Sequence, residues 1–201
     1  MYWADLESKN EVLVICLFHF LGVLMEWYKV YHGSWTYPEE AWTKIWGVPL
    51  YSGFMYASVA SYLCQAWKHF DLKITNYPPK WLSYPMAAAI YLNFFSNAYI
   101  IDVRWWLVGI LILIFRKTDV YYTPIKKIRV MPLILSFLLI GFFIWLAENI
   151  ATFLGAWKYA HQHTGWQMVK WHKLSSWSLL VIVSVIIVAE LKRFKHELME
   201  K

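Results

Sequence analysis

Two glutamates stand near the ends of apolar stretches, and each opens the same spaced pattern, Glu-x6-Gly-x-Trp-x-Tyr. The members of the two copies are Glu26, Gly33, Trp35 and Tyr37, and Glu148, Gly155, Trp157 and Tyr159. Each copy ends one apolar segment and precedes another. The pattern therefore predicts an internal duplication with two parallel repeats.

A carboxylate at the centre of a membrane helix costs about 2.5–3.5 kcal/mol, and less near the interface, so its presence calls for a reason. Parallel repeats would bring Glu26 and Glu148 to the same depth, where they could face one cavity and share a proton. Such a pair can act as a general acid and base, a proton carrier or a cation ligand. We take these two residues as the candidate catalytic groups. The four Trp and Tyr residues of the pattern are candidates for lining the pocket.

A purely structural interpretation of the same pattern is also possible. A glutamate one turn from a helix end can extend to the interface without doing any chemistry. Gly-x-Trp-x-Tyr is also typical of a helix end followed by an interfacial aromatic anchor.

Further polar residues are expected at the same depth. Asp102 and Arg104 begin one apolar segment, either compensating each other's charge or offering Arg104 to a glutamate or an anionic head group. Asn149 adds hydrogen-bonding capacity. His19 lies two turns before Glu26 on the same helix face, where it could also bond a neighbouring helix. We expect these four side chains to contribute to substrate binding.

The sequence contains no recognisable cofactor or metal motif, and we expect neither group. His161, His163 and His172 lie close together, but no Glu or Cys completes a zinc-type site.

The elements that must position these residues are apolar helices. Of the 201 residues, 60% are hydrophobic and only 16% are charged, which is outside the range of a soluble domain. The predicted fold is an all-α polytopic transmembrane bundle in one integral membrane domain, residues 1–201. Its predicted spans are Val12–Tyr31, Val48–Trp67, Trp81–Ser96, Ala98–Phe115, Val130–Phe153 and Leu174–Leu191. Repeat 1 covers 12–67, a hairpin covers 81–115 and repeat 2 covers 130–191.

The basic residues predict the orientation of these six spans. About two thirds of the Lys and Arg residues fall on the side that holds both termini, which places the termini in the cytoplasm of a multi-pass cell-membrane protein. Because this charge lies in short loops between apolar segments, the net charge of +6 does not indicate nucleic-acid binding. Membrane lipids are the expected partners, and a homo-oligomer is left open.

Two resemblances to known families add to this prediction of a membrane protein with paired glutamates. The stretches over residues 33–67 and 131–159 resemble an uncharacterised bacterial membrane-protein family, domain of unknown function 817, over nearly the whole chain. Members of that family are longer at the N-terminus, with two more apolar segments, so the resemblance implies that this chain starts late. More weakly, Glu148, Thr152, Gly155, Trp157 and Tyr159 are similar to a pattern of membrane carotenoid cyclases and hydratases. That likeness implies protonation of an isoprenoid double bond, although the "PEE" of this chain lies in a loop and not at the start of a span.

These observations favour a lipid- or isoprenoid-directed enzyme or binder that uses the paired glutamates. One alternative is a small-solute or proton-coupled transporter or channel, and a second is a structural or sensor component of the membrane. Whether the protein is an enzyme is left open.

Overall fold

The computed structural model describes residues 3, 6–97 and 99–199, with side chains as far as residue 192. The α-helices in this part of the chain are α1 (Lys9–Tyr31), α2 (Ser52–His69), α3 (Lys80–Ser96), α4 (Arg104–Phe115), α5 (Leu133–Phe153) and α6 (His172–Met199). The short strands are β1 (Trp35–Thr36), β2 (Lys44–Ile45), β3 (Val48–Pro49), β4 (Lys73–Thr75), β5 (Asp119–Tyr122), β6 (Arg129–Pro132) and β7 (Lys158–Tyr159), and a 3-10 turn, η2, covers Ala160–Gln162.

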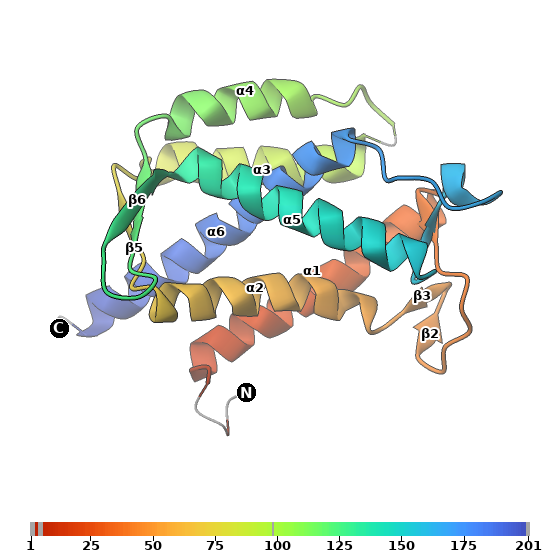
Figure 1. The fold of residues 1–201 in the computed structure, drawn as a ribbon, viewed down its shortest axis with the longest axis horizontal. Helices are drawn as coiled ribbons and strands as arrows, with labels where there is room; N and C mark the ends of the chain where they lie inside the picture. The colour runs from red at the N-terminus through yellow and green to blue at the C-terminus, as the bar shows by residue number, and fades with distance from the viewer. Residues whose placement is uncertain (1–2, 4–5, 98, 200–201) are drawn as a thin grey trace.

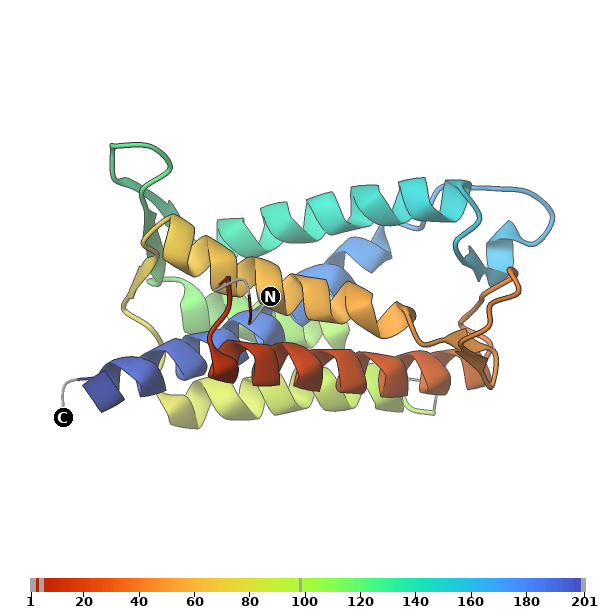
Figure 2. The ribbon, with the colours of Figure 1, turned by 90° about the horizontal axis from the view of Figure 1, so that it is seen from below.

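Helix α6 is the centre of the bundle, because it contacts each of the other five helices described. It crosses the molecule diagonally between the pair α1 and α2 and the pair α3 and α4, with α5 alongside (Figures 1 and 2). Its middle part, residues 179–189, is apolar apart from one serine, which is typical of a helix surrounded by others. Val181 and Val188 are fully buried there.

The outer faces of the bundle are apolar. Leu138 and Phe143 on α5 are 49% and 63% exposed, and Phe20 on α1 is 59% exposed. Three helices, α1, α5 and residues 172–192 of α6, are long and apolar enough to cross a bilayer. Large exposed apolar faces on such helices are stable only against lipid, so the protein belongs in a membrane.

Short strands close the two ends of the bundle, which the all-α prediction missed. At one end, beside the C-terminal part of α6, β4, β5 and β6 form an antiparallel sheet. At the other end β1 pairs with β7, and β2 and β3 form a hairpin. The hairpin loop, Trp46 and Gly47, has φ of 50° and 81°, as a two-residue type I′ turn requires. A cluster of buried side chains lies under this second end: Trp35, Tyr37, Val48, Trp145, Tyr159 and Val169.

Three predicted span limits are corrected by these strands and loops. The second helix begins at Ser52 because residues 48–49 pair in β3, and the fifth begins at Leu133 because residues 129–132 pair with β5. The fourth helix begins only at Arg104, and its 12 residues reach about 18 Å, well short of a hydrocarbon core of about 30 Å. Six complete crossings therefore stay a prediction.

Candidate functional site

Glu26 and Glu148 occupy equivalent places on two different helices. Each lies about one and a half turns before the end of its helix, α1 and α5 respectively. The side chains are turned inward, since the two residues are only 2% and 3% exposed. The alternative in which these glutamates extend into the interface is therefore wrong.

Both helices end with the same turn. Gly33 and Gly155 follow the helix ends with φ of +66° and +84°, a conformation that glycine adopts without steric cost. In each turn the N–H of the residue after the glycine donates to the carbonyl five residues back, at 2.9 and 3.0 Å. This is the Schellman arrangement, and it turns the chain back toward its own helix. In the first copy Trp35 and Tyr37 therefore lie over Glu26, and in the second copy Tyr159 lies over Glu148.

The two copies of the pattern then pair with each other. β1 and β7 are antiparallel, with Trp35 opposite Tyr159. The rings of these two residues lie 5.9 Å apart, and those of Tyr37 and Trp157 lie 6.5 Å apart. Each copy thus places its Trp against the Tyr of the other, which joins the ends of α1 and α5.

Glu26 accepts three hydrogen bonds from uncharged donors. The indole Nε1 of Trp35 and the hydroxyl of Tyr37 donate to Oε2, at 2.7 and 2.8 Å. The hydroxyl of Tyr56, on α2, donates to Oε1 at 2.7 Å. Each carboxylate oxygen of Glu26 therefore accepts at least one hydrogen bond, and the carboxylate acts only as an acceptor in this arrangement.

Glu148 repeats this arrangement with two donors. The hydroxyl of Tyr159 donates to Oε1, and the indole Nε1 of Trp177, on α6, donates to Oε2 at 2.7 Å. Tyr159 corresponds to Tyr37, and Trp177 on α6 takes the place that Tyr56 has on α2. The two glutamates do not bond each other; each is held by its own aromatic donors.

A cavity of about 40 Å³ separates the two glutamates, and we call it the carboxylate cavity. Besides Glu26 and Glu148, it is lined by Trp35, Tyr37, Met55, Tyr56, Phe94, Trp157, Tyr159, Lys173, Ser176, Trp177 and Leu180. The ammonium of Lys173 lies over the rings of Trp35 and Tyr159, at 4.9 and 4.4 Å from their centroids. No carboxylate in the described part of the chain lies within 4.0 Å of this ammonium, so its close partners are the two aromatic faces.

The tyrosines of the pattern stay protonated. Burial raises the pKa of Tyr37 and Tyr159 well above its usual range, and the negative charges of Glu26 and Glu148 beside them add to the effect. Both hydroxyls therefore remain hydrogen-bond donors at any physiological pH.

Asp102 and Arg104 lie beside the carboxylate cavity, not in it. The guanidinium of Arg104 donates to Asp102 through Nε and Nη2, both at 2.6 Å, and Nη1 donates to Ser176 Oγ at 2.9 Å. Burial alone would raise the pKa of Asp102, but the hydrogen bonds from Arg104 and Asn93 outweigh it and hold that pKa below its usual value. Arg104, Asn93 and Ser176 line a neighbouring cavity, described below.

The other two predicted binding residues lie apart from the carboxylates. Asn149 is buried, donates to the carbonyl of Trp145 at 2.8 Å and accepts the N–H of Val169 at 2.9 Å, so it fixes the loop before α6. His19 packs on Phe54 with ring centroids 4.4 Å apart. Neither lines the carboxylate cavity.

Among the lining residues that were not predicted from the sequence, Tyr56 and Trp177 donate to the glutamates and Lys173 lies on two aromatic rings. Tyr56 and Trp177 follow their glutamates by 30 and 29 residues, on the helix after each loop, but their residue types differ and the spacing alone does not mark them. Lys173 has no counterpart in the first copy. Its position at the start of an apolar helix gave no sign that the ammonium would turn inward.

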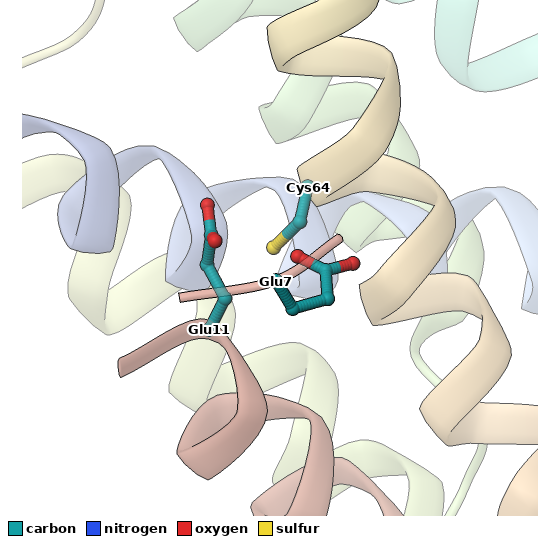
Figure 3. A group of neighbouring side chains, drawn as sticks. All are labelled: Glu7, Glu11 and Cys64. Carbon is teal, nitrogen blue, oxygen red and sulfur yellow. The ribbon is translucent and has the colours of Figure 1, made fainter. Parts of the chain in front are cut away.

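A second buried group of acids lies near the start of α1. The oxygens of Glu7 and Glu11 and the sulfur of Cys64 lie within 4.8 Å of one another (Figure 3). Lys68 bonds Glu11 at 2.8 Å and Glu7 at 3.4 Å, and Lys192 also bonds Glu11. A metal ion would have to displace both ammonium groups, so this group is best explained as an ion-pair network that holds α1, α2 and α6 together.

Comparisons with known structures show the fold. Two crystal structures of MvINS, a mycobacterial Insig homolog from Mycobacterium vanbaalenii, match with a TM-score of 0.62 at 13% identity, over 90% of this chain and 92% of MvINS. One of them is a cross-linked trimer of a cysteine variant of MvINS. At this identity the likeness concerns the arrangement of helices alone.

Sequence comparisons show the family. The uncharacterized protein YoaT of Bacillus subtilis (strain 168) is 56% identical over 197 residues, which cover 98% of this chain and 75% of YoaT. None of these matches supports the weaker resemblance to carotenoid cyclases and hydratases. The family model described as protein of unknown function (DUF817) matches residues 1–185. The chain is therefore a member of the DUF817 family.

Proposed function

We propose that the protein binds a single amphipathic ligand of the lipid class, isoprenoids included, with the polar end of that ligand at the carboxylate cavity. The observation that carries the proposal is a second cavity. It has a volume of about 310 Å³, lies between α1, α2, α3 and α6, and shares Tyr56 and Leu180 with the carboxylate cavity. We call it the apolar cavity.

The two cavities differ as the two ends of an amphipath differ. The apolar cavity is lined mostly by Leu, Val, Ile, Phe, Met and Ala side chains, and its volume falls in the range of small-molecule sites. The carboxylate cavity, at about 40 Å³, has room for a few water molecules or for the polar atoms of a head group, but not for an isoprenoid ring.

The hydrogen bonding favours binding over acid catalysis. Both oxygens of Glu26 already accept bonds from donors that keep their protons, and Glu148 is held in the same way. A general acid would need a proton directed at the substrate. Catalysis by these glutamates would therefore require the ligand to displace a Tyr or Trp donor. Transport and a purely structural role become outcomes of the test below.

The membrane arrangement is part of the proposal. We place all six helices in the bilayer as one integral membrane domain of two repeats, 12–67 and 130–191, joined by the hairpin 81–115. Both termini face the cytoplasm of a multi-pass cell-membrane protein, and the carboxylate cavity lies near the outer surface. A homo-oligomer is also proposed, because the neighbour MvINS has been cross-linked as a trimer.

The binding test uses protein purified in mild detergent from its host membrane. Native mass spectrometry should find a retained lipid, and diazirine analogues of oleate and of geranylgeraniol should show which chain type labels the protein. Ala87→Phe places a ring in the apolar cavity and should abolish retention and labelling. Leu92, on the same helix, is 65% exposed. Leu92→Phe is therefore the matched control and should behave as wild type.

If wild type, Ala87→Phe and Leu92→Phe were labelled equally and none retained a lipid, the proposal that the protein binds a lipid would be wrong. If proteoliposomes of such a protein conducted protons or solutes in a Glu26-dependent manner, transport would replace it. If they did not, the structural role would replace it.

A further inference from the structure

Lys29 is a buried cation that lacks an anionic partner. It lies in the last turn of α1 and is only 6% exposed. Its ammonium donates to Oδ1 of Asn97 at 2.8 Å and lies 4.4 Å from the ring centroid of Phe94. In the part of the chain that the structure describes, no carboxylate lies within 4.0 Å of it.

The charges around Lys29 do not make up for this. Lys173 and Arg104, both positive, are near enough to repel it. The anion that attracts it, Asp102, is already held by two bonds from Arg104. A buried ammonium costs several kcal/mol unless an anion and hydrogen bonds compensate it, and no carboxylate of the described residues is in contact with Lys29, so a bound negative group would stabilise this position.

A cavity lies where such a group could bind. It has a volume of about 40 Å³, and we call it the Arg104 cavity. Arg104, Asn93, Asn97, Phe94 and Ser176 form its polar and aromatic side. Lys29 is not itself a lining residue, but its ammonium contacts two of these residues, Asn97 and Phe94, from behind.

Hydrogen-bond donors remain available at this place. An ammonium has three donors, and Lys29 uses one, on Asn97. The Nδ2 group of Asn97 has no acceptor within the described residues, since the side chain bonds Lys29 through Oδ1. A phosphate or carboxylate is the chemistry that accepts several such donors and supplies the missing charge.

We propose that the Arg104 cavity is the binding site for the anionic group, phosphate or carboxylate, of the amphipathic ligand. This inference rests on the proposed function, because the Arg104 cavity shares Met25, Tyr91, Leu180 and Val183 with the apolar cavity. Through Phe94, Ser176 and Leu180 it also adjoins the carboxylate cavity. The ligand then has an anionic group at Lys29, donor groups such as hydroxyls at the glutamates, and an apolar chain in the bundle.

The test measures the melting temperature of delipidated protein in detergent with three probes. Oleoyl lysophosphatidic acid and monoolein carry the same chain and differ in the phosphate, and inorganic phosphate carries no chain. Wild type should respond to the anionic lipid at about tenfold lower concentration than to monoolein, the factor expected for a charge-assisted hydrogen bond. A comparable response to inorganic phosphate alone would instead identify a free anion as the source.

Two lysine variants separate binding from folding. Lys29→Met keeps the length of the side chain and removes the charge. It should raise the melting temperature without lipid, since an uncompensated charge is gone, and it should remove the preference for the anionic lipid. Lys170→Met removes an exposed lysine near the same end of the bundle and should change neither property.

The outcomes distinguish this inference from the one on which it rests. If wild type responds equally to both lipids and Ala87→Phe abolishes both responses, the apolar cavity binds lipid but the anion site is wrong. If neither lipid has an effect on any variant, the binding function itself fails. A melting temperature that falls in Lys29→Met would show that the lysine has a structural partner, and would also overturn the inference.

Discussion

Two groups of buried glutamates, at opposite ends of α1, solve the same problem differently. Glu11 and Glu26 are 1% and 2% exposed and lie 15 residues apart, about 22 Å along the helix. Glu11 is neutralised by the ammonium groups of Lys68 and Lys192. Glu26 is bonded by uncharged tyrosine and tryptophan groups, as is Glu148.

This difference suggests separate roles: the ion pairs at Glu11 stabilise the fold, and the site at Glu26 and Glu148 binds a ligand. Where the opposite charges are in contact, each ammonium is bonded to a carboxylate and the network is complete. At the other end lie four ionisable side chains, Glu26, Glu148, Lys173 and Lys29, and none of them forms an ion pair within the described residues. Uncharged donors fix the geometry there and leave these side chains without an ion-pair partner in the part of the chain that the structure describes.

The largest effect is expected from Glu11→Gln. Glutamine keeps the hydrogen bond to the N–H of Ser8 at the start of α1, so the loss concerns the charge. Lys192 would then lose the carboxylate that it bonds, and of its two carboxylate contacts Lys68 would keep only the longer one, to Glu7 at 3.4 Å, at a cost of about 3–5 kcal/mol. Denaturant unfolding in detergent measures this. Asp71→Asn, in an exposed pair with Lys73, should cost almost nothing, and an equal loss in both variants would contradict the comparison.

A smaller effect is expected from Trp177→Phe. The change removes the indole donor to Glu148 and keeps an aromatic ring in its place. Removing one partner and leaving a buried polar group unsatisfied costs about 1–3 kcal/mol, and that is the expected loss in the same unfolding assay. Trp171→Phe, which is 60% exposed and makes no bond to a glutamate, serves as the control.

The sharpest contrast with Glu11 is expected from Glu26→Gln, which should cost about 1 kcal/mol or less. The amide oxygen can accept from Trp35 and Tyr37, and the amide nitrogen can donate to Tyr56 once that hydroxyl rotates. The measurement is the free energy of unfolding of Glu26→Gln, compared with that of Glu11→Gln. A loss of several kcal/mol would mean that the charge of Glu26 is itself needed for folding.

The smallest effect is expected from the pH dependence of the Asp102–Arg104 pair. Since the folded state holds the pKa of Asp102 below its usual value, the unfolded chain binds the proton more tightly. The pair therefore stabilises the protein above about pH 4, and this stabilisation is lost as the pH falls through the lowered pKa. Melting temperatures at about pH 6 and about pH 3 should differ less in Asp102→Asn than in wild type. If the melting temperature changed by the same amount in both proteins, the Asp102–Arg104 pair would not contribute to the loss of stability in acid.

Much of the carboxylate site was predictable, and for a local reason. Helix ends are encoded by nearby residues, and the glycine after each helix turns the chain back so that Tyr37 and Tyr159 reach the glutamate of the same copy. The pattern predicted Trp35 and Tyr37 as residues that line a pocket at Glu26, but not that both donate hydrogen bonds to it. Tyr56 was missed because its contact crosses between two helices and depends on how they pack.

The amino-acid order alone determined that this chain forms apolar helices and that two of them end in matching turns over a glutamate, because both properties depend on residues within a few turns of each other. Which charges meet was decided only by the packing of distant helices. Lys192 reaches Glu11 across 181 positions, whereas Lys29 and Lys173 come to lie on aromatic rings, with no carboxylate of the described residues in contact. Local sequence cannot encode such pairings, since the helices that carry the partners come together only in the folded bundle.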